Sequence, residues 1–202
     1  MARPKTALLS RAAIAEAAIA LVDAGEDLQV IPLAKALGVS PSSLYHHVDG
    51  RDGIIHAMRE VLSARYATPN VDGLDWEERL RKLVASLGRL YLDHPQVLQL
   101  LLTVVIEEPL TLELYEQLAE ALRDGGVPED ELLTTLETLD AFAFGVALDS
   151  LSPESIFARN RVAPQFDELI DRHPVGEARN RRLFEHGLEL LISGIRARFA
   201  PA

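Results

Sequence analysis

The stretch from residue 31 to residue 58 reads IPLAKALGVSPSSLYHHVDGRDGIIHAM and constrains the fold more than any other part of the chain. It predicts a first short helix whose apolar face carries Leu33, Ala34 and Leu37. Gly38 follows where a chain leaving a helix often needs positive φ. Ser40 then precedes Pro41, a good N-cap before a good first-turn residue, so a second helix is predicted to begin there.

The second helix is predicted to have one buried and one exposed face. Leu44 and Val48 lie four residues apart and face inward. At about 100° per residue, the polar side chains point away from this pair; they are Ser42, Ser43, Tyr45, His46 and His47. Hydroxyl and imidazole groups in such a row bond phosphates and base edges, so the stretch predicts a DNA-binding helix-turn-helix rather than a merely polar surface. The adjacent histidines are not a metal pair, because neighbouring helical residues point in different directions.

The run LAKALGVSPSSLYHHVDGRDGII resembles the DNA-binding segment of the TetR family of repressors, through Val39, Leu44, Tyr45, His47, Val48 and Arg51. The later run LFEHGLELLISGI resembles the last helix of the same family. The resemblance implies an all-α protein, with an N-terminal three-helix helix-turn-helix domain and a C-terminal helical domain for ligand binding and dimerisation. It also implies that Arg51 contacts phosphate.

The expected DNA-binding residues follow from the motif and the resemblance together. They are Arg3, Lys5, Lys35, Ser40, Pro41, Ser42, Ser43, Tyr45, His46, His47 and Arg51. The first two lie on an N-terminal arm that either reaches phosphates or the minor groove, or is simply a frayed terminus. Val30 and Ile31 stand where family members commonly carry a hydroxyl and then a polar or basic residue, so we expect the first helix to brace the second, with Lys35 as its only cation.

The composition bounds the class of protein. The formal charge is −11, but the first 66 residues carry equal numbers of basic and acidic side chains, so the acidity lies beyond the motif. Local charge sets phosphate attraction, since screening acts over about 8–10 Å at physiological salt. There are no cysteines, no apolar run reaches membrane-spanning length, and MARPKT lacks the apolar core of a signal peptide, so we expect a cytoplasmic protein.

The segment TPNVDG, residues 68–73, is the clearest hinge, which predicts two domains. The first spans residues 1–66 and ends in a linker helix over 51–66. The second, for ligand binding and dimerisation, spans 67–202 and is expected to be helical throughout. Within it, residues 96–107 are apolar nearly all round, which predicts one buried helix.

Glycines in two long helical patterns suggest where a dimer forms. Gly145, Gly187 and Gly194 each cost about 1 kcal/mol relative to alanine inside a helix, and such glycines usually mark close helix approach. The resemblance implies a four-helix homodimer interface here, which would set the two helix-turn-helix domains about one DNA turn apart on a palindromic operator. The alternative is a monomer whose glycines relieve internal crowding.

The resemblance also implies a ligand pocket in the second domain, although ordinary core is the default for apolar residues. The candidate lining is Leu83, Leu87, Tyr91, Leu101, Val105, Tyr115, Leu136 and Phe142. The residues that hold magnesium-tetracycline in the tetracycline repressor class are missing: the matching positions carry Ala67, Leu83, Leu87, Val105 or Ile106, and Ala121. We therefore expect a mainly apolar or aromatic effector, with no cofactor and no metal, and Glu107, Glu108 and Asp149 as its polar anchors or as solvated charges.

The chain is thus expected to be a ligand-responsive transcriptional repressor that binds a palindromic operator as a homodimer and is released by a small molecule. The alternative is a helix-turn-helix scaffold that serves as a sensor or interaction module without binding DNA, which the apolar Val30–Ile31 pair and the low basic charge support. An enzyme is not expected, because the six histidines are scattered and no carboxylate pair or Ser-His-acid set has catalytic spacing.

Overall fold

The computed structural model describes residues 9–158 and 161–199, and within them the regular structure is entirely helical. The chain forms two compact units. The N-terminal unit comprises residues up to 67 together with 96–112; the C-terminal unit comprises 68–95 and the residues from 113 onward. The all-α prediction is confirmed, while the functional division between residues 66 and 67 stays a prediction.

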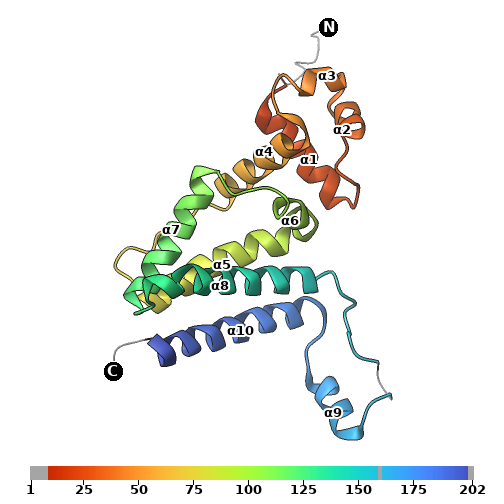
Figure 1. The fold of residues 1–202 in the computed structure, drawn as a ribbon. Helices are drawn as coiled ribbons and strands as arrows, with labels where there is room; N and C mark the ends of the chain where they lie inside the picture. The colour runs from red at the N-terminus through yellow and green to blue at the C-terminus, as the bar shows by residue number, and fades with distance from the viewer. Residues whose placement is uncertain (1–8, 159–160, 200–202) are drawn as a thin grey trace. The chain divides into compact units, whose positions relative to one another are not determined.

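The N-terminal unit is built on four helices that follow one another closely (Figure 1): α1 (Arg11–Asp23), α2 (Val30–Leu37), α3 (Pro41–Leu44) and α4 (Gly50–Arg65). Ser10 caps α1 by accepting from the Ala13 amide at 3.1 Å. Gly38 ends α2 with φ of 67°, as its position predicts. The four helices enclose an apolar core. The large side chains that are fully buried in this core are Ile14, Leu33, Leu44, Ile54, Ile55, Met58 and Leu62.

The prediction of one buried helix over residues 96–107 is wrong. Helix α6 (Pro95–Leu101) stops after Leu101, and the next residues form a turn and then an irregular segment, in which Leu102 is exposed and Val105 is 80% exposed. The carbonyls left unpaired at the end of α6 and just beyond it are bonded by the guanidinium of Arg59 on α4. A charged donor thus replaces the continuation of the helix.

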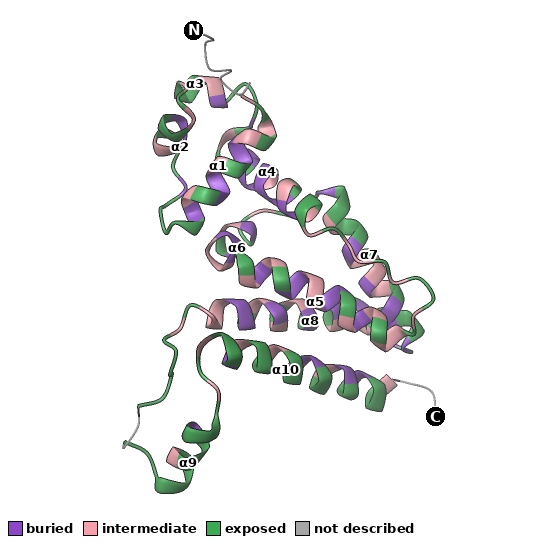
Figure 2. Ribbon diagram, turned by 180° about the vertical axis from the view of Figure 1, so that it is seen from behind, coloured by how far each residue is buried: buried purple, intermediate pink, exposed green. Residues whose placement is uncertain are grey.

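The C-terminal unit is a bundle in which α5 (Trp76–Asp93), α8 (Glu129–Asp149) and α10 (Gly176–Phe199) lie side by side (Figures 1 and 2). Asp75 caps α5 by accepting from the Glu78 amide at 2.9 Å. Helix α7 (Pro109–Asp124) begins in the N-terminal unit and continues into this one. Helix α9 (Pro164–Arg172) follows, and the ring of Phe166 on this helix packs edge to face against that of Phe157, with centroids 5.3 Å apart.

The helical glycines differ in what surrounds them. A Cβ added at Gly187 would lie 2.4 Å from the Phe142 ring, and one added at Gly88 would lie 2.4 Å from the Phe184 ring. Both glycines therefore let helices of a single chain approach closely. Gly145 and Gly194 are exposed, with nothing within 4 Å of an added Cβ. The crowding explanation thus holds for Gly187, and only Gly145 and Gly194 remain without a reason inside one chain.

Candidate nucleic-acid interface and ligand site

The predicted DNA-binding helix, α3, is called the reading helix from here on; it is short but presents the predicted face. Helix α3 ends at Leu44, and residues 45–47 continue as turns, with the His47 amide bonded to the Leu44 carbonyl at 2.9 Å. Leu44 and Val48 are buried, whereas Tyr45, His46 and His47 are exposed. The polar side chains therefore stand on the outside of the N-terminal unit, held there by the two apolar ones.

Three serines meet at the start of α3. The Ser40 hydroxyl accepts from the Ser43 amide at 3.3 Å, and it lies 2.8 Å from the hydroxyls of both Ser42 and Ser43. Ser40 thus caps the helix, and the exposed Pro41 occupies its first turn. These contacts rigidify the loop that leads into the reading helix.

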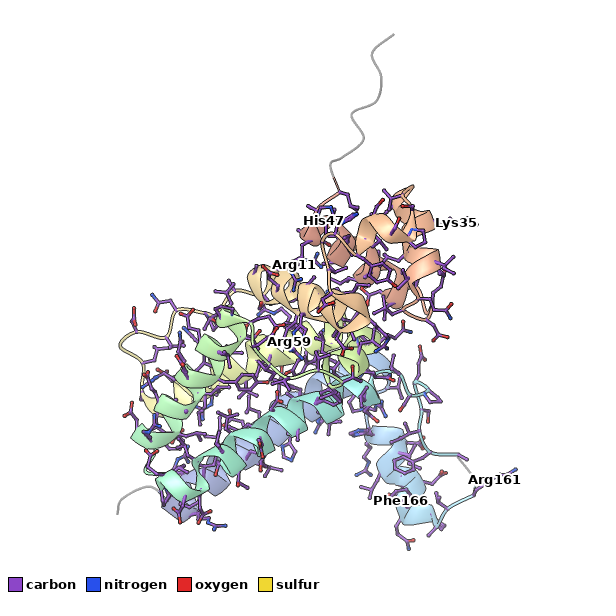
Figure 3. The ribbon with its side chains drawn as sticks, turned by 45° about the horizontal axis from the view of Figure 1, so that its top comes forward. Arg11, Lys35, His47, Arg59, Arg161 and Phe166 are labelled. Atoms are coloured by element: carbon purple, nitrogen blue, oxygen red, sulfur yellow. The ribbon has the colours of Figure 1, made fainter. Side chains whose placement is uncertain are left out.

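The remaining predicted DNA contacts lie on neighbouring elements. Lys35 is exposed in the last turn of α2, and Arg51 is exposed in the first turn of α4 (Figure 3 labels Lys35 and His47). Arg3 and Lys5 lie outside the described residues. A hollow of about 460 Å³ brings Tyr45 and Arg51 together with Val30 and Ile31.

The start of α2 differs from the brace that its apolar sequence predicts. Gln29 provides no side-chain cap, as the missing hydroxyl implies. Val30 is half-buried, but Ile31 is 73% exposed and so cannot brace the reading helix by burial. The bracing side chains of α2 are Leu33 and Ala34, which are buried one turn further along.

A buried polar cluster on α4 was not predicted. Arg59 donates to the carbonyls of Leu101, Val104 and Val105 and to Glu108 Oε2 at 3.0 Å. His56 Nδ1 lies 2.8 Å from the other oxygen of the same carboxylate. All of these groups belong to the N-terminal unit, so the cluster fastens residues 101–108 to α4. The available signal was that Arg59 falls on the apolar stripe of α4, four residues after Ile55 and three before Leu62.

The cluster decides the charge state of Glu108. Burial alone would raise the pKa of this carboxyl, but hydrogen bonds from His56 and Arg59 outweigh burial and lower it. Glu108 therefore has structural partners, and so does Asp149, whose Oδ2 lies 2.7 Å from Arg179. Of the three expected polar anchors only Glu107 is well exposed, with its carboxylate 3.5 Å from His56.

The eight candidate pocket residues do not form one group. In the C-terminal unit, Leu83, Leu87, Tyr91 and Leu136 are buried, while Phe142 stacks on Phe184 of α10 at 5.7 Å. Leu101 is buried and Val105 exposed in the N-terminal unit. A hollow of about 940 Å³ in the C-terminal unit, between α5 and α10, is lined by none of the eight but by several arginines and Phe184.

One part of the candidate set does carry polar chemistry. The Tyr91 hydroxyl donates to Asp140 Oδ1 at 2.7 Å and lies 3.5 Å from the Tyr115 hydroxyl. Burial raises the pKa of Asp140, against the effect of hydrogen bonds from the two phenols, and burial also raises the pKa of Tyr91. Asp140 was not predicted, because a single acidic residue among apolar ones on a long helix forms no motif that would mark it as a binding residue.

Residues 9–158 and 161–199 contain no group of three or more histidine, aspartate or glutamate side chains placed to hold a metal ion. None of their helices is long and apolar enough to cross a membrane.

Comparison with known proteins gives a family and several relatives. The family model described as "Tetracyclin repressor-like, C-terminal domain" matches residues 68–199. An HTH-type transcriptional repressor of Mycobacterium tuberculosis is 27% identical over 188 residues, which span 83% of this chain and 72% of that protein.

Among solved structures, apo ActR of Streptomyces coelicolor is 25% identical with a TM-score of 0.78, over 95% of this chain and 96% of that one. ActR has also been solved in complex with actinorhodin; that structure is 24% identical with a TM-score of 0.74, over 95% and 98% of the two chains. BioQ with its double-stranded DNA operator is 23% identical with a TM-score of 0.70, over 94% and 99% of the two chains. At these identities the likeness to ActR in its complex and to BioQ establishes the fold.

Proposed function

We propose that this chain, which belongs to the tetracycline repressor-like (TetR) family, is a DNA-binding transcriptional repressor that works in the cytoplasm. It would bind a palindromic operator as a homodimer and leave it when a small molecule binds the C-terminal unit. The observation that carries the proposal is the face of α3 and the turn after it, where Ser42, Tyr45, His46 and His47 are exposed while Leu44 is buried.

That face has the groups a major groove requires. Imidazoles, hydroxyls and a phenol bond phosphates and base edges, and Arg51 adds a cation at the start of α4. None of the groups on the face discriminates bases as strongly as a bidentate arginine or asparagine, so sequence choice would lean partly on DNA shape. The relatives support this role, since one is named a repressor and BioQ was solved with its operator.

The homodimer would form on the exposed face of α8 and α10. Gly145 and Gly194 lie there, each with open space around it in the single chain, although glycine weakens a helix interior. A second copy packed closely on this face would explain both. A two-fold dimer would then present its two helix-turn-helix domains about one DNA turn apart.

Release by a ligand would pass along α7. This helix continues without a break from the segment that Arg59 fastens to α4 into the C-terminal unit, where Tyr115 meets Tyr91. A ligand that binds one arrangement of α7 better than another lowers DNA affinity by the ratio of its affinities for the two states. ActR, which was solved both empty and with actinorhodin, supports a ligand-responsive reading of this fold.

The test is selection of bound DNA from a random library, followed by binding of the selected fragment at about 50 and 200 mM salt. Arg51→Ala should weaken binding and reduce the salt slope by about one phosphate contact. The matched control is Arg65→Ala, at the opposite end of α4 and paired with Glu16, which should leave both quantities unchanged. Selection that enriches no fragment, or binding that ignores salt, would contradict the proposal.

The second candidate, a scaffold that does not bind DNA, is favoured by one observation. Ile31 is 73% exposed at the start of α2, where an apolar side chain suits a protein partner better than a phosphate. The same selection experiment separates the two, because a repressor enriches DNA fragments from the library whereas a scaffold that does not bind DNA enriches none.

A further inference from the structure

Four side chains from three helices of the C-terminal unit meet at Asp140. Tyr91 comes from α5, Tyr115 from α7, and Asp140 and Phe144 from successive turns of α8. Tyr91 donates to the carboxylate at 2.7 Å, and Tyr115 also hydrogen-bonds to it. The rings of Tyr91 and Phe144 pack edge to face with centroids 5.9 Å apart. The result is a carboxylate bonded by two phenols, one of which packs on a third aromatic ring.

This carboxylate has donors but no cation. In the described part of the chain, the side chains that affect the pKa of Asp140 are the two phenols and Glu137, and none of these carries positive charge. Two other acidic side chains that are withdrawn from water are paired with arginine: Glu108 with Arg59 and Asp149 with Arg179. A half-buried charge without a counter-ion is costly, so Asp140 is a candidate for a functional rather than a structural group.

The surroundings suit an apolar body joined to a cation. Leu87 lies one turn before Tyr91 and Leu136 one turn before Asp140, and both leucines are buried beside the cluster. Aromatic faces attract organic cations, and a carboxylate adds a charge-assisted hydrogen bond to a protonated amine. Asp140, Tyr115 and Phe144 keep intermediate exposure, so the cluster is not sealed from solvent.

We propose that Asp140, with Tyr91, Tyr115 and Phe144, binds the protonated amine of an effector that has an aromatic or apolar body. This inference rests on the proposed ligand response of the C-terminal unit and gives the effector its charge. It adds a positive charge to the mainly apolar or aromatic effector expected from the sequence, because the positive group that the site lacks is supplied by the ligand.

The experiment measures binding of three small probes to the full chain by calorimetry at pH 7, without DNA. The probes share a phenyl ring and differ in charge: 2-phenylethylammonium, 2-phenylethanol and 3-phenylpropanoate. The wild-type protein should bind the cation at least tenfold more tightly than the other two. Equal affinities, or a preference for the anion, would overturn the proposal without any variant.

Asp140→Asn should lower the affinity for 2-phenylethylammonium at least tenfold and change that for 2-phenylethanol less than threefold. The matched control is Glu137→Gln, an exposed carboxylate almost one turn away on α8, which should change the cation affinity less than threefold. Equal losses of affinity for all three probes would show that Asp140 is structural. A larger effect of Glu137→Gln would show that the cation responds only to the overall negative charge of α8.

Two further readouts complete the test. Asp140→Asn should keep or raise the Tm at pH 7, because it removes an unpaired, half-buried charge; a fall in Tm would indicate a structural role. Selected operator fragments are bound to the same preparations. Intact DNA binding without charge preference would overturn this inference alone, whereas cation binding without DNA binding would overturn the proposed repressor and leave the cation site standing.

Discussion

Replacing Arg59 by methionine should destabilise the N-terminal unit severely. Methionine keeps much of the length of the side chain but removes the guanidinium that bonds Glu108 and the carbonyls of Leu101, Val104 and Val105. The side chains of Arg59 and Glu108 are each 7% exposed, so water cannot replace the lost partner without opening the structure. The carboxylate would keep His56 and the backbone amide of Glu107, which donates to Oε2 at 3.3 Å, but no permanently charged partner.

The magnitude follows from what is left behind rather than from the number of bonds. Breaking a buried ion pair by removing one partner costs about 3–5 kcal/mol, because the remaining charge stays buried. The carbonyls at the end of α6 add to this cost unless the 101–108 segment detaches and meets water. With a urea m-value of about 2 kcal/mol/M, the unfolding midpoint should fall by about 1.5–2.5 M.

The assay is urea unfolding followed by circular dichroism, with Arg11→Met as the matched control. Arg11 pairs with Glu60 at 3.0 Å, but the two side chains are 42% and 60% exposed, so its loss should cost at most about 1 kcal/mol. The double variant Arg59→Met/Glu108→Gln should be less destabilised than the sum of its single variants, because the second change removes the stranded charge.

Comparable midpoints for Arg59→Met and Arg11→Met would refute the reasoning. Such a result would mean that the 101–108 segment is not held by this cluster in solution. Additivity in the double variant would refute the narrower statement that the stranded carboxylate causes most of the loss.

Three further predictions concern pH, helix approach and the reading helix. Because the pKa of Glu108 lies below its ordinary 4.5, its charge stabilises the fold above pH 4.5, and this contribution is lost as pH falls through the lowered pKa; Glu108→Gln should flatten that part of a Tm-against-pH curve, and an unchanged slope would contradict this. Gly187→Ala should lower the Tm, because its Cβ would meet Phe142 at 2.4 Å, whereas Gly145→Ala should raise helix stability by up to about 1 kcal/mol and weaken the dimer in sedimentation; equal Tm changes would refute the distinction. Leu44→Ala should cost about 2–5 kcal/mol in urea unfolding, while Tyr45→Ala should leave stability within about 0.5 kcal/mol and weaken binding to selected DNA; the reverse order would contradict the assigned faces.

The sequence by itself determined the features that depend on neighbours along the chain. Gly38 and Ser40 mark the turn through their own backbone and capping preferences, and both act as predicted. The period of the helix decides that Leu44 and Val48 face inward and that Tyr45 and His47 face outward. These statements need no knowledge of distant residues, which is why the helix-turn-helix and most of its exposed face could be predicted.

Only the tertiary structure decided which distant residues meet. Arg59 finds its partners 42 to 49 residues away, and that pairing ends α6 early and attaches residues 101–108 to the N-terminal unit. Asp140 meets Tyr91 across 49 residues, and Gly187 is explained by a phenylalanine on another helix. Spacing along a helix determines the face on which a side chain lies, but the group opposite that face depends on how the helices pack, and for this protein that packing decides where buried charge is paired and where it is left for a ligand.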